Sequence, residues 1–199
     1  MGMGVSRALR ALAIAVALTV GALGLQAAAA ASGTAPVITS LSVDHGPTAG
    51  GNQVVIGGND FGTSPTVTFG GAPAPLFSAS QTSITVTAPP GQGSVLVVVT
   101  GSGQASNGAT YTYDPPLVTT VSPFGGPTAG ANTVVIDGVN FGTSPTVTFG
   151  GVPAAVVTRT QTSITVTAPP GVGSVAVVVT VAGQASNPAP YIYDAPQLT

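Results

Sequence analysis

Short stretches of alternating apolar and polar residues recur along most of the chain. Val67 and Phe69 alternate with threonines, and Ile84, Val86 and Ala88 do the same in the next stretch. A period of two is expected of half-buried β-strands, because successive side chains of a strand point to opposite faces. Glycine and proline clusters separate the stretches, as turns do. The pattern predicts strands at residues 37–43, 53–57, 66–69, 76–79, 83–88, 95–100 and 110–113.

The whole pattern occurs twice. Residues 46–71 return as residues 126–151, an offset of 80 (126 − 46 = 80), and no insertion or deletion interrupts the match. A unit of this length is longer than the repeats of solenoids and has the size of a small domain. No segment after residue 31 has the helical spacing of apolar residues. We therefore expect an all-β protein of two tandem β-sandwiches with about seven strands each.

The repeat sets the predicted domain boundaries. The first domain covers residues 36–114 and the second residues 116–194, and they meet at Pro115–Pro116, a stiff junction. Residues 32–35 form a short leader, and residues 195–199 resemble the start of a third repeat.

Residues 1–31 differ in character from the rest. Arg7 and Arg10 precede an apolar stretch, and alanines lead up to Ala31. This order is typical of a helical secretory signal peptide, with cleavage expected between Ala31 and Ser32. The alternative is a retained membrane anchor, because the apolar and alanine stretches together approach the roughly 20 residues that a span needs. Both interpretations predict export, and cleavage predicts a secreted protein without membrane contact.

Charged side chains are scarce after residue 31. Arg159 is the only basic side chain beyond residue 31, and the chain contains neither lysine nor cysteine. Binding to nucleic acid or to an anionic membrane requires clusters of Lys and Arg, so both partners are excluded. An exported protein without cysteine must hold its domains together without disulfides.

Catalytic residues do not gather in any motif. His45 is the only histidine, its equivalent in the second copy is Gly125, and glutamate is absent. Asp114 and Asp194 occupy equivalent positions in separate domains, too far apart to act as a pair of glycosidase carboxylates. We expect no enzyme and no cofactor.

Two loops invite a ligand interpretation. The segment GPTAGGN at residues 46–52 lacks the lysine and the following helix of a phosphate cradle, so we interpret it as a loop in which glycines permit unusual backbone angles. Asn59–Asp60 corresponds to Val139–Asn140 in the second copy. Because the oxygen ligands differ between the copies, Asx turns account for these loops better than Ca²⁺ does. We expect no metal site.

Four segments in order carry a family resemblance. They are ITSLSVDHGPTAGGNQVVIGGNDFG, VTFGGAPA, TSITVTAPPGQGSVLVVVT and YTYD in the first copy, and the second copy matches equally well. Over nearly all of the chain after the predicted signal peptide, the sequence resembles the IPT/TIG domain, an immunoglobulin-like module of the early-set type. The resemblance implies an immunoglobulin-like β-sandwich of the kind found in cell-surface receptors, in transcription factors and in exported bacterial proteins. It does not fix a function.

One predicted strand is apolar on both faces. Val95, Val97 and Val99 can fill the core while Leu96 and Val98 point the other way, and Ala176 and Val178 are their equivalents in the second copy. Such a strand needs a second cover, which is either a neighbouring strand or loop or a docking partner.

Aromatic residues bear on a sugar-binding interpretation. Phe61, Phe69, Tyr111 and Tyr113 recur in the second copy, as core packing requires, so they are not expected to form an exposed platform. We predict a secreted, non-catalytic monomer for extracellular or cell-wall-associated binding or spacing, with an extracellular protein or a cell-wall polysaccharide as partner. The alternatives are a carbohydrate-binding accessory module and a truncated remnant of a larger surface protein.

Overall fold

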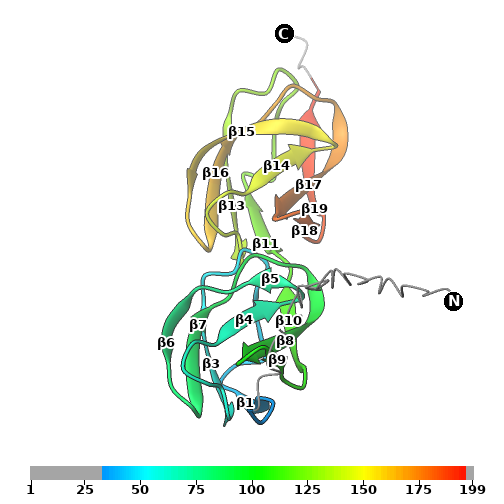
Figure 1. Ribbon diagram of the computed structural model, residues 1–199. Helices are drawn as coiled ribbons and strands as arrows, with labels where there is room; N and C mark the ends of the chain where they lie inside the picture. Colours follow the sequence, from blue (N-terminus) through cyan, green and yellow to red (C-terminus); the bar gives the residue numbers. More distant parts are fainter. Residues whose placement is uncertain (1–32, 196–199) are drawn as a thin grey trace, which may run out of the picture. The chain divides into compact units, whose positions relative to one another are not determined.

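The computed structural model describes residues 33–195. All the regular secondary structure in this range consists of β-strands (Figure 1). The predicted signal peptide and its Ala31–Ser32 cleavage site lie outside the described residues. Within residues 33–195 there is no helix that could span a membrane.

The first repeat folds into two sheets. One has the strand order β1-β3-β7-β6, and the other has the order β2-β10-β8-β4-β5 with β9 paired to β8. All pairs are antiparallel except β2 with β10, which is parallel. The strands are β1 (Val37–Leu41), β2 (His45–Pro47), β3 (Gln53–Asn59), β4 (Thr66–Phe69), β5 (Ala72–Pro73), β6 (Leu76–Ala79), β7 (Ser83–Thr87), β8 (Gly93–Gly101), β9 (Gln104–Ala105) and β10 (Ala109–Asp114).

The second repeat has the same strands with one difference. Its strand order is β11-β13-β16-β15-β14-β17-β19-β12 with β18 paired to β17, so the two layers are joined in one hydrogen-bonded path. The strands are β11 (Leu117–Ser122), β12 (Gly125–Pro127), β13 (Thr133–Val139), β14 (Thr146–Phe149), β15 (Val152–Arg159), β16 (Ser163–Thr167), β17 (Gly173–Val181), β18 (Gln184–Ala185) and β19 (Ala189–Asp194).

A single residue explains the joined layers. β15 pairs through Ala154 with β14 and through Ala155 with β16. The residue equivalent to Ala155 is Pro75, which has no backbone N–H to donate to a ladder. The corresponding strand of the first repeat is therefore divided into β5 and β6, one in each sheet.

Three short strands were not among the predicted elements. These are β2, β5 and β9, each of two or three residues. The segment at residues 46–52 was interpreted as a loop, and this is corrected for Gly46 and Pro47, which pair with Tyr113 and Asp114 in β10. The rest of the segment agrees with the prediction, because Gly50 and Gly51 have φ angles of 65° and 87°, a region that favours glycine.

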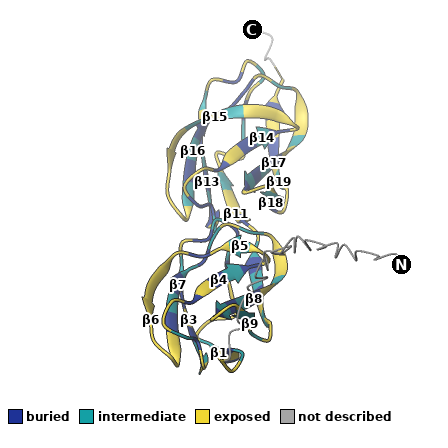
Figure 2. Cartoon of the chain, in the orientation of Figure 1, coloured by how far each residue is buried: buried dark blue, intermediate teal, exposed yellow. Residues whose placement is uncertain are grey.

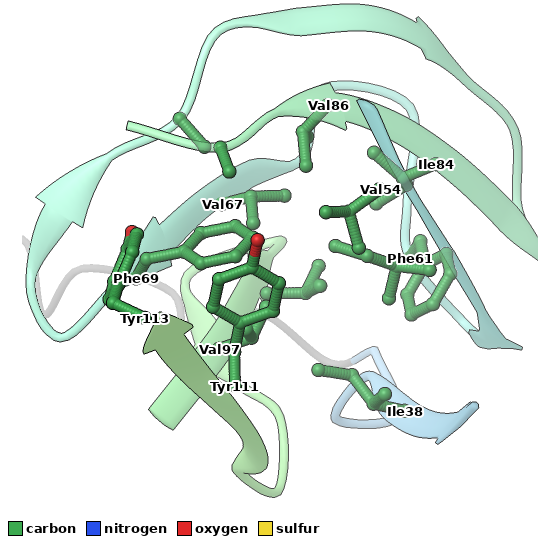
Figure 3. Packing of buried hydrophobic residues seen from close by; sticks show 14 residues of the cluster. Ile38, Val54, Phe61, Val67, Phe69, Ile84, Val86, Val97, Tyr111 and Tyr113 are labelled. Atoms are coloured by element: carbon green, nitrogen blue, oxygen red, sulfur yellow. The ribbon is translucent and has the colours of Figure 1, made fainter. Parts of the chain in front are cut away.

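The core of each repeat lies between its two layers of strands. Figure 3 shows the first one, where Val54, Ile84 and Val86 of one sheet face Val97 and Tyr111 of the other. The further members of this buried cluster include Ile38, Ile56, Phe61, Val67, Phe69, Val99 and Tyr113, and the second repeat buries the equivalent residues. The recurring aromatic residues are thus core residues, as their repetition predicted.

The aromatic rings in this core pack edge to face. The ring of Tyr111 lies 5.0 Å from that of Phe69 and 5.1 Å from that of Tyr113, which is a favourable geometry for such pairs. The Tyr111 hydroxyl accepts a hydrogen bond from the Asn52 side chain at 2.9 Å, so its polar end is satisfied inside the domain. Gly46 lies beside this hydroxyl, and a Cβ there would overlap with it.

An asparagine clamps the first strand of each repeat to the other sheet. The Asn107 side chain accepts a hydrogen bond from the Ile38 N–H at 2.8 Å and donates one to the Ile38 carbonyl at 3.0 Å. Asn187 makes the same two bonds with Val118. The amide side chain thereby satisfies a strand peptide group that has no neighbouring strand on that side.

Candidate binding faces

The predicted interaction face of the first repeat lies on the solvent side of β8. Val97 and Val99 are fully buried, whereas Leu96 is 54 % exposed and Val98 is half-buried. β8 runs between β4 and β10, so its outward residues have neighbours on both sides. We call this set the first outer face; it consists of Thr66, Thr68, Leu96, Val98, Thr100, Thr110 and Thr112. It carries no charged side chain.

The second repeat presents a differently shaped face. Ala176 and Val178 lie on the solvent side of β17, opposite Pro190 and Thr148. A shallow hollow of about 360 Å³ opens at Ala176, lined also by Pro188 and Pro190. In the first repeat Leu96 occupies this place, because its side chain lies within about 3 Å of where a Cβ of Gly108 would be. Leu96 and Val98 thus share one face, and Ala176 and Val178 share its counterpart in the other repeat.

Two exposed aromatic residues were missed by the sequence analysis. Phe77 is 74 % exposed and Phe124 is 71 % exposed. Neither recurs, since their equivalents are Val157 and Asp44. Their lack of repetition is the signal that could have identified them, because a core aromatic of a tandem repeat recurs.

A β-bulge explains the exposure of Phe77. In β6, Leu76 is opposite Val86 and Ser78 is opposite Thr85, which leaves Phe77 as the extra residue without a partner. β6 is also the last strand of its sheet, and all four of its residues are exposed (Figure 2). The bulge therefore directs an aromatic ring away from the core at a sheet edge.

The only histidine is hydrogen-bonded to a carboxylate. His45 of β2 donates from Nδ1 to the Asp114 carboxylate of β10 at 2.8 Å, and the two side chains are 65 % and 41 % exposed. The hydrogen bond to Asp114, followed by the negative charge of that carboxylate, raises the pKa of His45 above 6.5. The second repeat has Gly125 in its place. His45 thus supports the pairing of β2 with β10.

This pair predicts a pH dependence of stability. Because the folded-state pKa of His45 is raised, its contribution is fully present below pH 6.5 and is lost as the pH rises through the folded-state pKa. We expect Asp114→Asn to lower the pKa of His45 toward 6.5, measured by NMR titration of the imidazole, and to lower the melting temperature at acidic pH only. Asp194→Asn, which has no histidine beside it, is the matched control. An unchanged His45 titration in Asp114→Asn would contradict the assignment.

The loops considered for Ca²⁺ each contain one residue with a left-handed backbone. Asp60 and Asn140 have φ angles of 59° and 63°, a left-handed conformation that Asp and Asn tolerate better than other side chains. Within residues 33–195 no three metal-binding side chains of the His, Cys, Asp or Glu type come together.

Comparisons with known proteins give a family and several similar folds. The family model of the IPT/TIG domain matches the chain twice, at residues 36–113 and 116–193. Curated protein sequences give no match. Among solved structures, the extracellular region of plexin A4 is 21 % identical with a TM-score of 0.41, and the alignment covers 84 % of this chain and 19 % of the plexin chain.

Two further structures illustrate the range of similar proteins. SGBP-B from a xyloglucan utilization locus of Bacteroides uniformis is 23 % identical, with a TM-score of 0.37 and coverage of 80 % of this chain and 49 % of that one. The I9–I11 tandem of titin is 12 % identical, with a TM-score of 0.46 and coverage of 80 % and 66 %. The chain therefore spans about a fifth of the plexin chain and about half of SGBP-B.

Proposed function

Because the chain belongs to the IPT/TIG domain family, with one copy at residues 36–113 and another at residues 116–193, we propose that it is a secreted, non-catalytic protein for extracellular or cell-wall-associated binding or spacing. Two immunoglobulin-like domains in tandem present side chains at defined places on rigid sheets. The family alone does not identify a partner.

The outer faces carry the binding proposal. Leu96 protrudes from the first outer face, and the second repeat has a hollow at the equivalent Ala176. Neither face carries a charge, so docking there would remove no charged side chain of this protein from water. An exposed apolar side chain on an uncharged sheet face has the character of the centre of an interface, where a few buried residues supply most of the binding energy.

A second candidate function is carbohydrate binding, which rests on the exposed Phe77. An aromatic ring with a free face can stack on the apolar face of a sugar. Thr85 and Ser78 are beside it on the same sheet, and their hydroxyls can exchange hydrogen bonds with sugar hydroxyls. A cell-wall polysaccharide is the partner that this site favours.

One experiment distinguishes the two. The purified chain is tested against a glycan array and, by surface plasmon resonance, against the secreted protein fraction of the source cells. We expect Leu96→Asp to weaken protein binding about tenfold or more, because a charge would be buried without a counterion, and Phe77→Ala to leave it unchanged. Val157→Ala is the matched control for Phe77→Ala.

The opposite outcome is equally clear. Glycan binding that Phe77→Ala removes and Leu96→Asp does not affect would establish the second candidate in place of the first. Binding of either kind that responds to neither substitution would overturn both sites.

A further inference from the structure

A groove of about 580 Å³ runs along the first repeat between β1 and the start of β10. Its walls are residues 38–44 on one side and Asn107, Ala109 and Thr110 on the other. The groove exists because the chain changes sheets here: β1 pairs with β3 as far as Leu41, and β2 pairs with β10 only from Thr112 onward. The first residues of β10 therefore have β8 on one side and no strand on the other.

The peptide group of Thr110 faces this groove. The Thr112 N–H donates to the Asp44 carbonyl at 2.8 Å and so points away from β8. Thr110 is two residues earlier in a regular antiparallel ladder, so its N–H and carbonyl point the same way. Leu96 is the residue opposite Thr110 in β8. Its carbonyl accepts a hydrogen bond from the Gly70 N–H at 2.9 Å and so points away from β10. Leu96 and Thr110 are therefore a non-hydrogen-bonded pair of the ladder. Thr110 therefore offers an unpaired donor and acceptor to the groove.

The second repeat closes the equivalent edge. Its residue in place of Thr110 is Pro190, and Pro188 replaces Gly108. Proline cannot donate to a ladder and is one of the devices by which proteins keep sheet edges from pairing. The two repeats otherwise share their fold. Pro190 blocks strand pairing at this edge in the second repeat, whereas Thr110 leaves the same edge of the first repeat able to pair.

Charge favours one kind of occupant. Asp44 lines one end of the groove. The adjacent His45 is hydrogen-bonded to the Asp114 carboxylate of β10, which is not part of the groove. Arg159 is the only Lys or Arg among the described residues and belongs to the other repeat. A cationic side chain of a partner would thus find the Asp44 carboxylate at the end of the groove, with no lysine or arginine among the groove residues to neutralise it.

We propose that this groove binds an extended peptide segment of another protein, which adds as a strand beside Thr110 and places a lysine or arginine next to Asp44. Backbone hydrogen bonds supply affinity in this mode, and the side chains supply specificity. The inference rests on the proposed binding function and names a partner class for it. The groove lies at the free edge of β10, beside the first outer face, and uses the Thr110 backbone in place of the Leu96 side chain.

Hydrogen exchange tests whether the edge is open. In the purified chain, the Thr110 amide is expected to exchange much faster than the Thr112 amide, which is bonded to Asp44. Protection of the Thr110 amide in the free protein would show that the edge is already paired and would overturn the proposal.

Peptide selection tests the occupant. A phage-displayed library of random peptides about 12 residues long is selected on the immobilised chain, and the enriched peptides are synthesised for titration. We expect peptides with a basic residue at one end that protect the Thr110 amide on binding. Thr110→Pro should weaken them about tenfold or more, since it removes the donor, and Asp44→Asn should weaken them and reduce the salt dependence of binding.

Controls separate this site from the first outer face, to which the Thr110 side chain also belongs. Thr110→Val changes that side chain but keeps the N–H, so peptides should still bind and protect the amide of residue 110. Thr110→Pro should fold, because Pro190 occupies the same position in the second repeat. The absence of enriched peptides, affinity insensitive to Thr110→Pro, or occupation of the groove by a glycan in its place would each overturn the proposal while leaving the Leu96 site standing.

Discussion

Replacement of Phe141 by alanine is expected to unfold the second repeat and to leave the first one folded. The Phe141 side chain is fully buried in the second core, and truncation of a buried phenylalanine costs about 3–5 kcal/mol. A domain of about 80 residues is near the lower end of the usual 5–15 kcal/mol of stability. Because the buried residues form one cluster in each repeat, the loss should be confined to one domain.

Two reporters make this measurement direct. His45 is the only histidine and lies in the first repeat, whereas Arg159 is the only arginine after the leader and lies in the second. Thermal unfolding followed by NMR should show native His45 signals after the Arg159 side-chain signals have become those of an unfolded chain. Phe61→Ala should give the reverse order. A single transition in both variants would mean that the two repeats unfold as one unit and that the predicted domain boundaries do not separate independent folding units.

Gly138→Ala is expected to destabilise the second repeat by about 3 kcal/mol or more. A Cβ at this position would overlap with the Leu117 carbonyl oxygen and with the Phe141 ring. Overpacking of a core typically costs 1–3 kcal/mol, and here the first obstacle is backbone. Leu117 is paired with Val139 in the β11–β13 ladder, so the oxygen cannot move without breaking strand pairing.

Urea unfolding of the second repeat measures this effect. For the parallel measurement on the first repeat, Gly33→Ala serves as the control, because the nearest atom to its added Cβ would be 3.7 Å away, on Ser102, an ordinary contact distance. Gly58→Ala should reproduce the loss in the first repeat, where the Val37 carbonyl and the Phe61 ring occupy the same places. A cost below about 1 kcal/mol would show that β11 can shift to accommodate a methyl group.

The strands that sequence could locate are those with an alternating pattern. Residues 66–69 and 76–79 were predicted with the bounds that the structure has, and the other five predicted strands differ by one or two residues at their ends. β2, β5 and β9 were missed because two or three residues cannot display a period of two. Their existence depends on partners far along the chain, as in the pairing of His45 with Thr112.

The sequence could predict which side chains of the candidate sites point outward, but not the shape of the surface that they form. The outward direction of Leu96 and Val98 follows from the burial of Val97 and Val99 between and beside them. Whether the face protrudes or is hollow depends on how Leu96 packs against Gly108 and how Ala176 lies beside Pro188, which the alternating pattern alone does not reveal. The exposure of Phe77 depends on a bulge, and the groove at Thr110 depends on a change of sheet; neither leaves a mark in the alternation.

Backbone angles show a similar limit. Gly51 was correctly expected in an unusual conformation, yet its equivalent Ala131 has a φ of 67°. An alanine rarely adopts this angle, so tertiary contacts of the loop must impose it in the second repeat. The Ala131 N–H bonded to the Ala168 carbonyl at 2.8 Å is one such contact, and Gly51 makes the same bond to Ala88.

The asparagine clamps have a consequence for the order in which the chain can fold as it is made. Asn107 secures Ile38 across 69 residues of sequence, and Asn187 secures Val118 across the same separation. Synthesis begins at the N-terminus, so β1 is made 69 residues before the asparagine that binds it. The first strand therefore lacks these two hydrogen bonds until nearly the whole repeat has been synthesised. Once Asn107 and β10 have emerged, the first repeat has every strand that it needs, while the second still lacks its own asparagine. Closure then proceeds one repeat at a time, in the direction of synthesis.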